Sequence, residues 1–172
     1  MKLRQEILKE HSKAQCVKIV KWVGSNQQRF DELFSLFLND DYRVVQRAAW
    51  PVSYCVMAHP SLINKHWKRF INNLKKPGLH DAVKRNSIRL MQDIHIPEKY
   101  HGEIMNICFE YLASPTESLA VKVFSMSVLA NLAKTYPEIK GELKLVIEDQ
   151  LPHQTAGFKS RAKKILKQFN SA

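Results

Sequence analysis

Apolar residues recur at the spacing of an α-helix along the whole chain. In segment 41–57, steps of three and four residues connect the apolar positions Val44, Val45, Ala48, Val52, Cys55 and Val56. Similar stripes predict further helices over 2–23, 26–38, 60–75, 80–94, 97–113, 117–134, 137–150 and 154–169. No segment shows a convincing strand pattern. The pattern therefore predicts an all-α protein of nine helices joined by short turns.

Three residues mark special points in these helices. Ser12 is a candidate N-cap that would divide the first helix in two, and Gly24 is a candidate stop signal after it. Pro51 falls inside the helix 41–57, where it removes a backbone donor. We expect it to kink that helix near Arg47 and Ala48.

The chain repeats itself at a period of 38 residues. Starting from Arg47, this step leads to Arg85, Val123 and Arg161. A fixed period of this size is typical of proteins built from stacked helix pairs. The same offset predicts one core that contains Val45, Val52, Val83, Leu90, Phe124, Val128, Ala162 and Leu166.

The repeated residues follow a recognisable order of a turn acid, a valine, an arginine and small residues. This order is clearest at Asp41, Val45, Arg47, Ala48 and Ala49. A partial match occurs at Val83, Lys84, Arg85 and Ser87, where Leu79 stands in place of the acid. Weaker traces remain at Ala120, Val121 and Lys122, and at Arg161 and Ala162. In these features the chain resembles the HEAT-repeat proteins of the ARM/HEAT superfamily.

The resemblance implies an α–α superhelix of about four HEAT-like helix pairs with an N-terminal capping helix. A single repeat domain would span residues 1–172, with the capping helix at 2–23. The pairs would lie at 26–57, 60–94, 97–134 and 137–169. Because each pair would bury its apolar stripe only against its neighbours, we expect the array to unfold cooperatively.

Basic residues gather in the second helix of each predicted pair. The chain carries a net charge of +11 at pH 7. The capping helix and the second helices (1–23, 41–57, 79–93, 116–134 and 154–169) hold 18 Lys and Arg and 6 Asp and Glu, a net +12, and the rest holds −1. In HEAT arrays the second helices line the concave surface, so the resemblance implies a basic groove. Such a charge favours anionic partners.

Eight residues are the candidate anion- or partner-binding groups of this groove: Arg47, Lys84, Arg85, Arg89, Lys122, Lys159, Arg161 and Lys164. The alternative is a structural ladder together with a solvated basic surface. In that case Arg47 and Arg85 would hydrogen-bond neighbouring turns, as ladder residues of HEAT repeats do.

The expected function is a non-enzymatic helical-repeat binding or scaffold module with a basic concave surface. Its expected partner is an acidic protein surface or a polyanion. The alternative is a nucleic-acid-binding or DNA-repair-like HEAT protein. Asp81 and Asp93 are the only acids of the middle second helix, which has no tryptophan, so it does not match the HEAT-like DNA glycosylases. The chain also lacks the Gly-Ser-Ser-x-Met-Pro-x-Lys sequence of the adenylosuccinate lyase superfamily.

The remaining reactive residues favour structural roles. Cys16, Cys55 and Cys108 lie far apart in apolar stretches and are expected to be buried thiols, with no metal site and no cofactor. Cys55 and His59 share a helix face, and we interpret them as a buried thiol and a helix-terminal histidine rather than a catalytic pair.

Two further expectations concern the tryptophans and the location of the protein. Trp22, Trp50 and Trp67 lie on or beside apolar stripes, which favours core packing for each of them, and Trp50 is the best candidate for an aromatic exposed in the groove. No apolar run approaches the ~20 residues of a membrane-spanning helix, so a cytoplasmic protein is expected.

Overall fold

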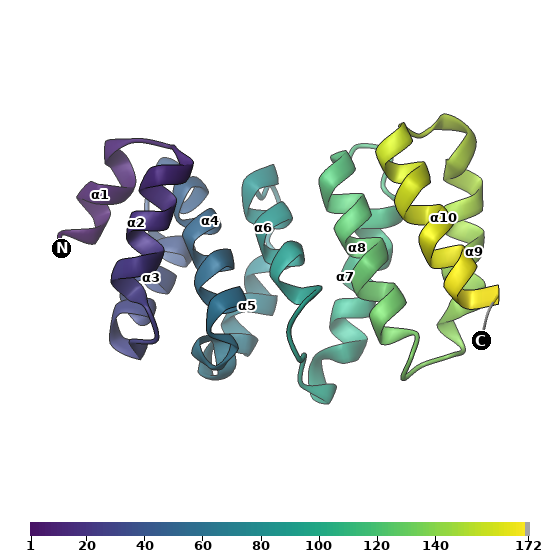
Figure 1. The fold of residues 1–172 in the computed structure, drawn as a ribbon, viewed down its shortest axis with the longest axis horizontal. Helices are drawn as coiled ribbons and strands as arrows, with labels where there is room; N and C mark the ends of the chain where they lie inside the picture. The colour runs from purple at the N-terminus through teal and green to yellow at the C-terminus, as the bar shows by residue number, and fades with distance from the viewer. Residues whose placement is uncertain (171–172) are drawn as a thin grey trace. The chain divides into compact units, whose positions relative to one another are not determined.

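The computed structural model describes residues 1–170 and is all-helical over that range. Its ten α-helices, drawn in Figure 1, are α1 (Leu3–Lys9), α2 (Lys13–Val23), α3 (Gln27–Asn39), α4 (Tyr42–Ala58), α5 (Trp67–Leu74), α6 (Asp81–Met91), α7 (His101–Ala113), α8 (Leu119–Leu132), α9 (Ile139–Gln150) and α10 (Ala156–Asn170). Three short 3-10 helices are η1 (Pro60–His66), η2 (Glu98–Tyr100) and η3 (Leu151–His153). The all-α prediction is confirmed, since the described residues contain no strand.

The chain divides into two compact units, Met1–His95 and Ile96–Ala172. The predicted domain 1–172 crosses this division, and its last two residues lie outside the described part. The single domain and its four pairs therefore stay a prediction.

The long helix α4 is the centre of the first unit. Helices α1, α2, α3 and α6 all pack against it. Its buried stripe contains Val44, Ala48, Val52 and Val56, and small alanine side chains allow close packing of neighbouring helices. Pro51 is buried inside α4, and the helix continues past it to Ala58.

Local capping explains where the first helices begin and end. The side chain of Ser12 accepts a hydrogen bond from the backbone N–H of Gln15, so it starts α2 and separates it from α1. Gly24 ends α2 with a φ of 51°, a left-handed conformation that glycine adopts without strain. Both boundary predictions are confirmed.

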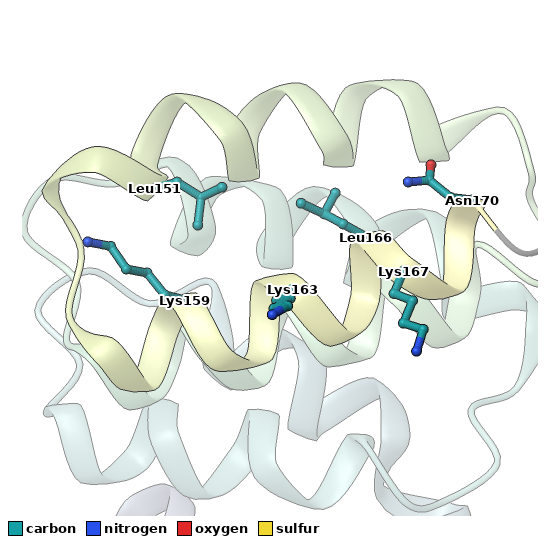
Figure 2. Close-up of a pocket in the computed structure, with 6 residues that line it drawn as sticks. All are labelled: Leu151, Lys159, Lys163, Leu166, Lys167 and Asn170. Carbon is teal, nitrogen blue, oxygen red and sulfur yellow. The ribbon is translucent and has the colours of Figure 1, made fainter.

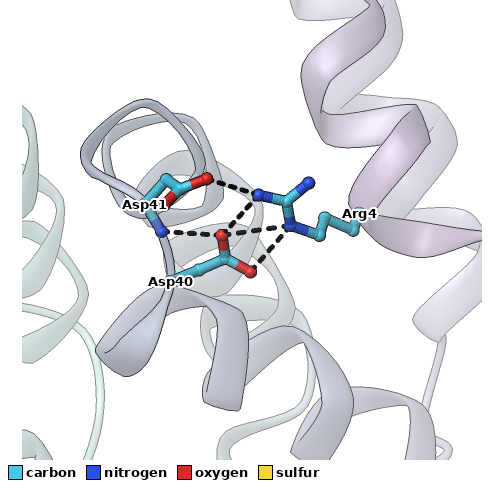
Figure 3. A network of polar contacts seen from close by, with 3 residues as sticks. All are labelled: Arg4, Asp40 and Asp41. Carbon is cyan, nitrogen blue, oxygen red and sulfur yellow. Dashed lines mark hydrogen bonds and ion pairs between the residues drawn. The ribbon is translucent and has the colours of Figure 1, made fainter.

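An ion-pair network attaches α1 to the turn before α4 (Figure 3). The guanidinium of Arg4 donates to Asp40 at 2.9 Å and to Asp41 at 2.6 Å. The hydrogen bond from Arg4 lowers the pKa of the Asp40 carboxyl. This network fixes a helix of only 7 residues, which would not be stable in isolation.

In the second unit, α8 holds the central place. Helices α7, α9 and α10 pack against it. Val121, Val128 and Leu129 of α8 are buried, as is Phe158 of α10. The side chain of Ser118 accepts from the backbone N–H of Val121 and so starts α8.

The predicted core is correct at five positions and wrong at three. Val52, Val83, Leu90, Val128 and Ala162 are buried. Val45, Phe124 and Leu166 are only half-buried. The physical reason is the packing register: the adjacent residues Val44, Ser125 and Ile165 take the buried positions instead. A fixed offset finds the repeat but not the side chain that points inward in each helix.

Candidate partner-binding surfaces

The eight candidate residues divide equally between the two units. Arg47 lies on α4, and Lys84, Arg85 and Arg89 lie on α6. In the second unit, Lys122 lies on α8, and Lys159, Arg161 and Lys164 lie on α10. All eight therefore occupy helices that the repeat pattern treats as second helices. Their side chains have very different surroundings.

Arg47 and Arg161 both make contacts inside the protein. Arg47 Nη1 donates to the backbone oxygen of Leu8 at 2.8 Å, near the end of α1. Arg161 Nη1 donates to the hydroxyl of Ser127, so it connects α10 to α8. The Arg47 contact is of the kind expected for a structural ladder residue. A binding role for either arginine stays a prediction.

Lys122 is buried, with 5% of its surface exposed. Its ammonium donates to Gln150 Oε1 at 2.8 Å, and Gln150 Nε2 in turn donates to the backbone oxygen of Leu112 at 2.6 Å. Burial lowers the pKa of Lys122, and the nearby Glu117 opposes this effect. The ammonium therefore connects α8 to the end of α9 and presents little surface to a partner.

Arg85 and Arg89 come together at a cavity of about 220 Å³ in the first unit. Its wall also includes His11, Gln46, Trp50 and Asn86. Arg85 Nη1 lies 3.2 Å from Asp81 Oδ2. The guanidinium of Arg89 lies 5.1 Å from the ring centre of Tyr54. Lys84 is half-buried on the same helix and does not line this cavity.

The three tryptophans differ in exposure. Trp67 is buried in the core, and Trp22 is half-buried beneath the guanidinium of Arg29. Trp50 is half-buried and borders the cavity of the two arginines. Trp50, the candidate for an exposed aromatic, thus borders a polar cavity.

Lys159 and Lys164 are exposed on α10, whose basic residues are Lys159, Arg161, Lys163, Lys164 and Lys167. No acid occurs in this helix. Along it runs an open groove of about 440 Å³ lined by Leu151, Lys159, Lys163, Leu166, Lys167 and Asn170. Figure 2 shows Lys159 at one end, Asn170 at the other, and Leu151 and Leu166 between them.

Of the lysines that line this groove, only Lys159 was predicted from the sequence as a binding residue, and Lys163 and Lys167 were not. A helical signal was present, since the three lysines follow one another at intervals of four residues and so share one helix face. Leu151 could not be found in this way, because it comes from η3 and reaches the groove only through the packing of α9 and α10.

The three cysteines are free thiols and are all buried. Burial raises the pKa of Cys55 to about 12, and Cys16 adds to the effect. The hydrogen bond between His59 and Cys55 joins backbone atoms. Within residues 1–170, no three His, Cys, Asp or Glu side chains form a group that could hold a metal ion. In the same range no helix has both the length and the apolar character needed to cross a membrane.

Packed helices that recur at a regular period define a helical-repeat protein. The chain matches the family of the HEAT repeat domain over residues 3–169. It therefore belongs to the HEAT-repeat family, as the repeat pattern predicted, and is a helical-repeat scaffold or binding module. Comparisons with curated proteins and with solved structures find no match.

Proposed function

We propose that this protein is a non-enzymatic binding module that takes an acidic, partly apolar segment of a protein partner. The segment would lie in the groove along α10. The observation that carries the proposal is the combination of exposed lysines with a leucine-lined floor in one groove of about 440 Å³. An acidic segment with interspersed apolar residues is complementary to both features.

Charge supports this assignment because several cations of α10 face solvent without a countercharge. Lys159, Lys163 and Lys164 are exposed, and none of them forms an ion pair within the described residues. A cluster of one sign attracts an oppositely charged partner over several ångströms and accelerates its association. Each exposed ion pair adds only about 0–1 kcal/mol to affinity, so charge alone gives weak binding.

The apolar floor supplies the second contribution. Leu151 and Leu166 are half-buried and line the groove between the lysines. Covering such apolar surface with a partner side chain contributes roughly 25 cal/mol for each Å² removed from water. A partner that presents leucine or phenylalanine together with carboxylates would therefore bind more tightly than a purely charged polymer.

The non-enzymatic part of the proposal rests on the state of the nucleophile candidates. The thiol of Cys55 is buried and stays protonated at neutral pH, which disfavours nucleophilic attack. The exposed cationic groove offers binding groups but no paired acid and base. Binding is the activity that these residues support best.

The proposal is tested with a fluorescent peptide of alternating glutamate and leucine and with a polyglutamate peptide of equal charge. We expect the glutamate-leucine peptide to bind more tightly. The double variant K159E/K163E should weaken its binding at least about tenfold, because two attractive contacts become repulsive. The matched control is K68E/K76E, which makes the same charge change at exposed positions of the first unit.

Equal loss of binding in both double variants would contradict a specific groove and indicate only non-specific charge. Duplex DNA is the test of the nucleic-acid alternative. A nucleic-acid site should show a slope of log K against log salt near −0.9 for each phosphate contacted. Tighter binding of duplex DNA than of either peptide at physiological salt would replace the proposed partner with nucleic acid.

A further inference from the structure

A second surface of the protein is the cavity of about 220 Å³ between α4 and α6. Gln46 and Trp50 of α4 border it, and both lie on one helix face because they are four residues apart. Asn86 and Arg89 border it from α6. His11 is exposed at its edge, so the cavity reaches the surface there, whereas Asn86 is buried.

The wall of this cavity is rich in hydrogen-bond donors and contains no carboxylate. Arg85 is partly neutralised by Asp81 at 3.2 Å. No ion pair joins Arg89 to a carboxylate of the described residues. Its guanidinium is held by the ring of Tyr54 at 5.1 Å and by the Tyr54 hydroxyl at 3.5 Å. A guanidinium fixed in this way is prepared for an anion at small entropic cost.

The indole N–H of Trp50 adds an independent observation. It is buried and has no hydrogen-bond partner within the described residues. Trp50 borders this cavity and also a smaller recess beside Glu10, and an unpaired buried donor next to a cavity favours a group with acceptor atoms there. An indole nitrogen can only donate, so a group that satisfies it presents an acceptor oxygen, and a phosphate has several.

We propose that this cavity binds the terminal phosphate of a phosphate monoester, or free inorganic phosphate. The ligand class follows from the wall: an arginine fork and neutral donors from two helices suit a tetrahedral group with several acceptor oxygens. The cavity volume of about 220 Å³ is large enough for a phosphate group. The phosphate of a nucleic-acid backbone is linked on two sides and cannot enter such a recess end-on.

This site is independent of the groove along α10. It uses other residues in the other unit, and it stands whether or not an acidic segment binds to α10. The source of the phosphate is either the free ion or a phosphorylated side chain, since both present the same oxygens.

The experiment follows the indole N–H signals in a ¹H–¹⁵N NMR spectrum during titration with sodium phosphate. The variant W50F identifies the Trp50 signal by its loss. At constant ionic strength, we expect phosphate but not chloride to move this signal to saturation. Replacement of Arg89 in R89Q should weaken binding at least about tenfold, as expected for the loss of a charge-assisted contact.

Arg69 provides the matched control because its guanidinium also stacks on an aromatic ring, that of Phe34 at 5.9 Å, but does not line the cavity. R69Q should bind phosphate as the unchanged protein does. A second variant, Q46E, adds a negative charge to the cavity wall without a change of shape and should abolish binding. It keeps the test decisive if R89Q fails to fold.

A phosphoserine peptide distinguishes the two sources. Binding of the peptide about tenfold or more tightly than inorganic phosphate supports a phosphorylated protein as ligand, and equal affinity supports the free ion. The proposal is overturned if phosphate up to about 50 mM leaves the Trp50 signal in place at fixed ionic strength. A shift that survives both R89Q and Q46E, or displacement of phosphate by duplex DNA without terminal phosphates, would overturn it as well.

Discussion

At the scale of single residues, Asp31 shows how hydrogen bonds outweigh desolvation. Its carboxylate lies 2.6 Å from Lys65 Nζ and 2.7 Å from His66 Nε2, and Gln27 Nε2 donates to it at 2.9 Å. Burial alone would raise the pKa, but these contacts lower the Asp31 pKa to about 2. The cluster attaches α3 to η1 and so joins the first and second predicted repeats.

The lowered pKa of Asp31 predicts a specific pH dependence of stability. Its unfolded value is 3.8 and its folded value about 2, so folding favours the ionised form. The contribution is complete above about pH 5 and is lost as the pH falls towards 2. We expect D31N to lose roughly 1–2 kcal/mol at pH 7, a value reduced by solvent screening of this partly exposed group. Urea unfolding at several pH values measures the loss.

The control for this measurement is E32Q, because Glu32 is the neighbouring carboxylate and is exposed. The stability difference between D31N and the unchanged protein should shrink between pH 5 and pH 2, whereas E32Q should show little difference at any pH. If D31N lowers the free energy of unfolding as much at pH 2 as at pH 7, packing rather than ionisation makes Asp31 important.

At the scale of elements, α1 depends on contacts with the rest of the first unit. It has 7 residues, too few for stability in isolation. Arg47 binds the backbone oxygen of Leu8, and Arg4 binds Asp40 and Asp41. These contacts satisfy one carbonyl near the end of α1 and fix the position of the helix on α4.

We therefore predict that R47Q loosens α1 before it affects the remaining core. The shorter, neutral glutamine side chain cannot reach the backbone oxygen of Leu8 in the same way. That oxygen, near the end of α1, then loses its hydrogen-bond donor. Amide hydrogen exchange should accelerate about tenfold or more in α1 and change little in α8. The comparison variant is R43Q, which alters an exposed arginine of the same helix α4. Equal acceleration in both variants would argue against the ladder role of Arg47.

The elements also show which features a sequence can predict. Ser12 and Gly24 set the two ends of α2 through hydrogen bonds to residues only three or four positions away, so both boundaries were predictable. The 3-10 helix η1 was expected to be part of an α-helix, because Pro60 is compatible with either form. The surroundings of Lys122 were not predictable, since its acceptor Gln150 lies 28 residues away on α9. The unpaired indole of Trp50 likewise depends on how α4 and α6 pack.

At the scale of the whole molecule, the basic charge has more than one use. The net +11 includes arginines that join helices internally, such as Arg47 and Arg161, and lysines that face solvent, such as Lys159 and Lys163. The surplus of positive charge in the second helices was visible in the sequence. The division of this charge between internal contacts and exposed surface required side-chain positions, because both uses place cations on the same second helices.

The cysteines allow a final prediction about the unfolding of the whole chain. Cys16 and Cys55 lie in the first unit and Cys108 in the second, and burial raises the pKa of each to about 12. The native thiols should therefore resist alkylation at neutral pH, so that each becomes reactive only when its unit unfolds. Pulsed labelling along a urea gradient, followed by mass spectrometry, gives one midpoint for each cysteine.

We expect the three midpoints to coincide. The 38-residue period runs through the division between the units without an insertion, since Arg85 and Arg161 are two periods apart. The HEAT repeat domain also covers both units, over residues 3–169. In such arrays the contacts between neighbouring repeats stabilise each repeat, so a short array unfolds in one transition. A Cys108 midpoint distinct from a shared midpoint of Cys16 and Cys55 would show two independent domains. The variant C55A is the control for a change in stability caused by labelling of Cys55. In this variant the midpoint of Cys16 alone measures the unfolding of the first unit.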